Sequence, residues 1–84
     1  MNLSVRANLS TQEIDGELVI ADKDNGQIHQ LNPVASVIWQ HIKSGLDANA
    51  IAEQLVQFYG IDEATAKADL DKVLGQFKEL KLLN

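Results

Sequence analysis

The sequence of 84 residues contains no cysteine, one proline and few aromatic residues. Without cysteine there is no disulfide to support the fold, and redox chemistry does not indicate a compartment. The N-terminal segment MNLSVRANLS lacks the continuous apolar run of a signal peptide, and no apolar run is long enough to span a bilayer. We therefore expect a cytoplasmic protein with no membrane partner, folded as one domain over residues 1–84.

Basic clusters and catalytic motifs are also missing. Seven basic residues stand against twelve acidic ones, giving a net charge of −5, whereas binding to a phosphate backbone requires clustered lysine and arginine. No nucleophile elbow, phosphate-binding loop or dinucleotide fingerprint occurs. His29 and His41 fall on different predicted elements, with no cysteine to complete a metal site. We expect a binding protein rather than an enzyme, with no metal, no cofactor and no nucleic-acid partner.

Turn signals divide the first third of the chain into strands. Asp15-Gly16 separates residues 12–14 from residues 17–21, and such a pair is typical of a two-residue hairpin turn. A second turn over residues 22–26 leads to a third strand over residues 27–31. We expect a three-stranded antiparallel meander in which the third strand is an edge, preceded by a frayed end over the first ten residues.

N-cap residues mark three helices in the rest of the chain. Asn32 (followed by Pro33), Asp47 and Asp62 can each accept a hydrogen bond from a first helical turn. Glycines 45 and 60 are expected to end the first two helices, and the third is expected to reach about residue 81. The predicted fold is α+β, a three-stranded antiparallel meander followed by three helices on one face of the sheet, resembling a winged helix.

Apolar stripes indicate which faces of the helices pack. The second helix has a stripe of Ile51, Leu55, Phe58 and Tyr59. On the third helix, an arc of roughly 120° contains Ala66, Leu70, Val73, Leu74, Phe77 and Leu80. An arc of this width can form core and still leave room for a ligand beside it.

The predicted edge strand is unprotected. Its residues Gln27, Ile28, His29, Gln30 and Leu31 include no proline and, with His29 neutral, no charge, although edge strands usually carry such features to prevent pairing with other chains. An extended peptide could add to this edge, with affinity from main-chain hydrogen bonds and specificity from side-chain pockets. Alternatively, the N-terminal segment or a second copy of the protein covers the edge. We expect the protein to be a monomer or a weak dimer.

Two other functions fit part of the pattern. A winged-helix DNA-binding protein would use the third helix for recognition, but that helix begins with Asp62 and Glu63, and the second turn offers only Lys23 as a basic residue. An acidic carrier protein would need an Asp-Ser-Leu-like attachment site, which none of the serines provides.

The order and spacing of many short fragments resemble the PqqD-like family over residues 12–83. These fragments are Gly26-Gln27-Ile28-His29-Gln30-Leu31-Asn32-Pro33, Ala35, Ile38-Trp39, Gly45, Ile51-Ala52, Leu55, Tyr59-Gly60-Ile61-Asp62, Asp69-Leu70, Phe77, Leu80 and Leu82-Leu83. The sequence departs from the family at Val34-Ala35, where many members have Thr-Gly, and at Leu82, where glycine is frequent, so the third helix is expected to continue into the tail.

The resemblance implies a recognition element for ribosomally synthesised and post-translationally modified peptides. Such domains bind the leader segment of a precursor peptide and present it to a modifying enzyme or leader peptidase. Carried over by position, the peptide-binding site comprises Gln27, Ile28, His29, Gln30, Leu31, Leu70, Val73, Leu74 and Phe77. The Gln-Leu-Asn-Pro run is most similar to free-standing members of lasso-peptide clusters, and a peptide chaperone of pyrroloquinoline quinone biosynthesis is the alternative.

Overall fold

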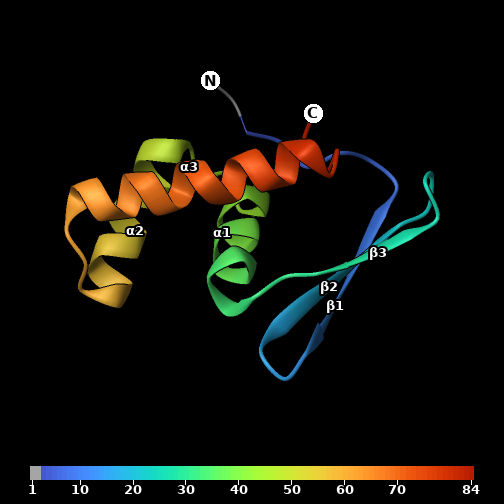
Figure 1. Ribbon diagram of the computed structural model, residues 1–84, viewed down its shortest axis with the longest axis horizontal. Coiled ribbons are helices and arrows are strands. Elements are labelled where there is room, and N and C mark those ends of the chain that lie inside the picture. The colour runs from blue at the N-terminus through green and yellow to red at the C-terminus, as the bar shows by residue number, and fades with distance from the viewer. Residues whose placement is uncertain (1–2) are drawn as a thin grey trace.

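The chain, described over residues 3–84 by a computed structural model, forms a small sheet followed by three helices (Figure 1). The elements are β1 (Leu9–Ile14), β2 (Glu17–Asp22), β3 (Gln27–Gln30), α1 (Pro33–Lys43), α2 (Ala48–Tyr59) and α3 (Glu63–Glu79). The sheet is antiparallel with the order β1-β2-β3, so β3 is an edge strand as predicted. The α+β prediction is therefore confirmed. Within residues 3–84, no helix is long and apolar enough to cross a membrane.

Local turn and cap chemistry forms these elements where the sequence predicts them. Asp15 and Gly16 both have positive φ, at 52° and 82°, as a tight hairpin turn requires. The Asn32 Oδ1 atom accepts a hydrogen bond from the Ala35 N–H at 2.8 Å and so caps α1. Asp47 and Asp62 cap α2 and α3 in the same way.

The core lies among the three helices and the face of β2 that α1 covers. Leu18 and Ile20 point from β2 toward the helices and are buried, while Trp39 of α1 is completely buried. The Trp39 ring meets the Phe77 ring of α3 edge to face, with centroids 5.3 Å apart. Aromatic pairs favour this geometry, and here it fixes α3 against α1.

Two predictions about the helices are wrong. Phe58 is 73% exposed, because α3 packs against the side of α2 that carries Ile51 and Leu55 and leaves the last turn uncovered. The third helix ends at Glu79 instead of continuing into the tail. Lys81 adopts a positive φ of 60°, and the Leu82 N–H donates to the Phe77 carbonyl at 2.9 Å. This reversal, a Schellman motif, turns the Leu82 side chain into the core, where it is fully buried.

The prediction of a frayed N-terminus is also wrong for the residues that the structure describes. β1 already begins at Leu9, and Val5 forms an antiparallel bridge with Leu83. The Arg6 N–H donates to the Leu82 carbonyl at 3.0 Å, so the N-terminal segment pairs with the C-terminal tail. This segment therefore does not cover β3. The first two residues of the predicted frayed end lie outside the described part of the chain.

Candidate functional site: the β3 edge and the hollows beside it

The backbone of β3 is unpaired on its outer side, and its register shows which groups point there. Leu31 lies opposite Leu18 and donates its N–H to the Leu18 carbonyl at 2.8 Å. Facing pairs in an antiparallel ladder alternate between bonded and non-bonded, so His29, opposite Ile20, also faces β2. The N–H and C=O groups of Ile28 and Gln30 therefore point away from the sheet, where an added strand would meet them.

A serine from α1 completes the inner ladder at the end of β3. Ser36 is buried, and its Oγ atom accepts a hydrogen bond from the Leu18 N–H at 2.9 Å. The same hydroxyl donates to the Leu31 carbonyl at 3.4 Å. Ser36 thus takes the place of the second bond of this pair, from the Leu18 N–H to the Leu31 carbonyl, and satisfies both backbone groups where the chain leaves the sheet for α1.

The side chains of β3 alternate between the two faces of the sheet. Ile28 lies on the face away from the core and is 74% exposed, while Gln30 on the same face donates from Nε2 to Glu17 Oε2 at 3.0 Å. His29 lies on the inner face, partly buried, and its Nε2 atom has no hydrogen-bond partner. Leu31 is buried and belongs to the core.

Two connected hollows lie between the end of β3 and α3. The first, of about 220 Å³, is lined by Gln30, Leu31, Asn32, Ala35, Gln76, Phe77, Glu79 and Leu80. The second, of about 260 Å³, is called the middle hollow below. It is lined by Asn32, Val34, Asp69, Lys72, Val73 and Gln76. Because Asn32 and Gln76 line both hollows, these form one surface beside the β3 edge.

The four predicted site residues on α3 divide into two pairs. Phe77 lines the first hollow and Val73 the middle one, whereas Leu70 and Leu74 line neither. All four are buried in the core, so a peptide in the hollows would contact only part of Phe77 and Val73.

Sequence reasoning missed the more exposed residues that line the hollows. Lys72, Gln76 and Leu80 follow each other at intervals of four and form a row along α3 beside the buried stripe. Asn32 was identified only as an N-cap, yet it also lines both hollows. The four-residue spacing was the signal that could have revealed this row.

The charged side chains of the site line the hollows and not the strand. Glu79, Asp69 and Lys72 are among the residues that line the hollows, while β3 itself has no acidic residue, lysine or arginine. Among residues 3–84, no group of three or more His, Cys, Asp or Glu side chains is placed to hold a metal ion. The arrangement is suited to binding an extended, largely uncharged segment.

A larger hollow lies elsewhere. It measures about 480 Å³ and lies between α2 and α3, where Glu53, Glu63 and Lys67 are among its lining residues. Glu63 and Lys67 already form an ion pair at 2.9 Å one helical turn apart. It adjoins no strand edge, so we place the candidate site at β3.

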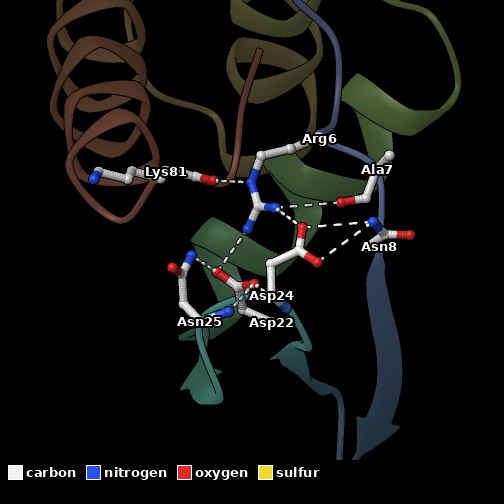
Figure 2. A network of polar contacts seen from close by, with 7 residues as sticks. All are labelled: Arg6, Ala7, Asn8, Asp22, Asp24, Asn25 and Lys81. Carbon is white, nitrogen blue, oxygen red and sulfur yellow. Dashed lines mark hydrogen bonds and ion pairs between the residues drawn. The ribbon is translucent and has the colours of Figure 1, made fainter.

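A polar network fixes the turn that leads into β3 (Figure 2). Asp22 is buried at the end of β2, where it forms an ion pair with Arg6 at 2.6 Å and accepts hydrogen bonds from the backbone N–H and side-chain amide of Asn25. The Asn25 amide, followed by Arg6, lowers the pKa of Asp22 from 3.8 to about 2. Arg6 also contacts Asp24 and donates to the Lys81 carbonyl. The network therefore connects the N-terminal segment, the β2–β3 turn and the end of α3.

Comparisons with known proteins show the same fold. A structure described as "TbiB1 in Complex with the TbiA(beta) Leader Peptide" is 25% identical, with a TM-score of 0.91, and the match covers 96% of this chain and 94% of that chain. A structure described as "Lasso peptide synthetase B1 complexed with the leader peptide" shares the fold, with 24% identity, a TM-score of 0.91, and coverage of 100% of this chain and 99% of that chain. No curated protein sequence matches the chain.

The sequence profile of "Coenzyme PQQ synthesis protein D (PqqD)" matches residues 17–83. This match begins at β2 and includes β3, all three helices and the reversal at Leu82. It therefore contains the whole candidate site, and the chain belongs to the PqqD family.

Proposed function

We propose that this protein binds the leader segment of a ribosomally synthesised precursor peptide by strand addition to β3. The observation that carries the proposal is the open edge of β3, which has no acidic residue, lysine or arginine, and whose Ile28 and Gln30 N–H and C=O groups point outward beside hollows that α3 lines. Strand addition obtains affinity from such main-chain groups and specificity from adjacent pockets. TbiB1, which has the same fold, is described in complex with a leader peptide.

The proposed peptide-binding surface comprises the backbone of residues 27–31 and part of α3. Val73 and Phe77 contribute the apolar floor of the hollows, with Gln76 and Leu80 beside them. Leu70 and Leu74 support this floor from the core. The role that we propose for this surface is presentation of the peptide and not catalysis.

We further propose that the bound leader is presented to a leader peptidase or another modifying enzyme of a lasso-peptide pathway in the cytoplasm. The likeness to a structure described as a lasso peptide synthetase complexed with the leader peptide supports this pathway. A role as peptide chaperone in pyrroloquinoline quinone biosynthesis is the second candidate, because the family profile carries the name of that pathway. The gene neighbourhood distinguishes the two: a peptidase and a cyclase accompany a lasso precursor, and a radical enzyme accompanies the quinone precursor.

Fluorescence anisotropy tests the proposal with a labelled synthetic leader peptide, whose sequence comes from the precursor gene that sequencing of the gene neighbourhood identifies. We expect saturable binding that changes little between low and high salt, because strand pairing and apolar contacts are weakly screened. A duplex DNA of random sequence is the control. Salt-sensitive binding to the duplex, with none to the leader, would refute the proposal and favour the winged-helix alternative.

A further inference from the structure

A third hollow continues the surface beside β3 toward the turn between α2 and α3. It measures about 260 Å³ and is lined by Val34, Leu55, Tyr59, Ile61 and Asp69. We call it the end hollow. Val34 and Asp69 also line the middle hollow, which in turn shares Asn32 and Gln76 with the first. The three hollows therefore form one trough that runs along α3 from the β3 edge, past the start of α1, to the last turn of α2.

The end hollow differs from the middle one in its chemistry. Its lining is aliphatic and aromatic except for Asp69, which lies at the boundary that the two hollows share. Leu55 is only 1% exposed and forms the floor, whereas Tyr59 is 38% exposed and forms part of a wall. An apolar hollow of this kind suits the side chain of an aromatic or branched aliphatic residue.

The length of the trough fits a single extended peptide. Between Leu80 at the first hollow and Asp69 at the end hollow, α3 rises about 16 Å at 1.5 Å per residue. An extended chain advances ~3.3 Å per residue and covers that distance with about five residues. Because β3 runs directly into Asn32, which lines the first two hollows, the strand edge ends where the trough begins.

We propose that the peptide bound at β3 continues along this trough and inserts a bulky apolar side chain into the end hollow. The inference rests on the proposed function and adds a second anchor about five residues from the strand-pairing segment. The occupant is the same peptide, because the trough is continuous with the β3 edge through shared lining residues. Two anchors on one chain bind more tightly than either alone, since the second engages at a high effective concentration.

The test uses a display library of random peptides of about 20 residues, long enough to span both anchors at ~3.3 Å per residue. Peptides enriched on the parent protein are synthesised with a fluorescent label and titrated against Tyr59→Ser and Ile61→Ser. Phe58→Ser is the matched control, because Phe58 neighbours Tyr59 and is 73% exposed but does not line the end hollow. Ile28→Pro, which blocks the β3 edge, tests strand addition in the same assay.

We expect enriched peptides to carry an apolar residue about five positions from the paired segment. Tyr59→Ser and replacement of that residue by alanine should each weaken binding about tenfold, and the two changes together no further, because they remove one anchor. Phe58→Ser should stay within about twofold of the parent. Melting curves show whether each variant is folded, and Tyr59→Ser decides the result if Ile61→Ser is unstable.

The outcomes separate this inference from the proposed function. If Ile28→Pro abolishes binding while Tyr59→Ser binds like the parent, strand addition stands and the second anchor is refuted. Equal losses in Phe58→Ser and Tyr59→Ser also refute the anchor, because the effect then belongs to the whole end of α2. If Ile28→Pro leaves binding unchanged, the proposed function itself fails.

Discussion

Substitution of Ile28 by proline tests the direction of the β3 backbone. Proline has no N–H and fixes φ near −65°, so its effect depends on where the replaced N–H points. The Ile28 N–H faces the open edge, and the Ile28 side chain is 74% exposed. Ile28→Pro should therefore retain the hydrogen bonds between β3 and β2 and the core. It should lose the hydrogen bond that the Ile28 N–H donates to a bound peptide.

The register allows both effects to be estimated. At the edge, the lost hydrogen bond is worth about 0.5–1.5 kcal/mol, and the proline ring also obstructs the incoming strand, so we expect leader affinity to fall at least ~10-fold. His29→Pro instead removes a bond to β2 and should cost about 3 kcal/mol of unfolding free energy. For a domain of this size, that corresponds to a melting temperature lower by well over ~10 °C.

Urea unfolding and leader titration of the same preparations give the answer. Ile28→Thr is the control, because it removes the apolar side chain but retains the N–H and a β-branched shape. We expect Ile28→Thr to bind leader nearly as well as the parent. The reasoning is refuted if Ile28→Pro binds leader normally, or if Ile28→Pro and His29→Pro lose equal stability.

Three further changes test other parts of the structure. Ser36→Ala leaves the buried Leu18 N–H without its partner and should cost about 1–3 kcal/mol in urea unfolding; an unchanged midpoint would contradict the bridging role of the hydroxyl. Since the pKa of Asp22 falls from 3.8 unfolded to about 2 folded, its stabilising contribution is complete above pH 4 and is lost as the pH falls toward 2. Acid titrations followed by circular dichroism should show a flatter loss of stability for Asp22→Asn, and identical curves would argue against the shift. Leu80→Ala should weaken leader binding at the first hollow, whereas Ile14→Ala, equally apolar but distant on β1, should not, as anisotropy would show.

Local chemistry explains why most of the fold could be predicted. The Asp15-Gly16 turn and the caps at Asn32, Asp47 and Asp62 depend on neighbouring backbone groups, so a short stretch of sequence determines them. The edge position of β3 followed from the same turns. Hydrophobic periodicity alone could not show that Phe58 is uncovered, because the end of α2 is exposed or buried according to its tertiary neighbours.

Contacts between distant segments account for the remaining errors. The pairing of Val5 with Leu83 joins the two ends of the described chain, and no local pattern indicates it. The buried Leu82 stabilises a turn at Lys81 that the apolar pattern alone would extend as helix. Of the candidate site, the β3 edge followed from turn positions, whereas the row of Lys72, Gln76 and Leu80 required knowledge of which side of α3 faces the strand.

The alternating direction of the backbone N–H groups along β3 has a consequence for hydrogen–deuterium exchange. In the free protein the amide protons of Ile28 and Gln30 face solvent and should exchange with deuterium rapidly, while those of His29 and Leu31 are held by β2 and should exchange slowly. Strand addition should slow exchange at Ile28 and Gln30 and leave His29 and Leu31 as they were. This pattern can be measured without any substitution. A ligand that only fills the hollows along α3 leaves those two protons unprotected. The exchange rates of these two amide protons, measured by nuclear magnetic resonance in solution, therefore report strand pairing in the unmodified protein.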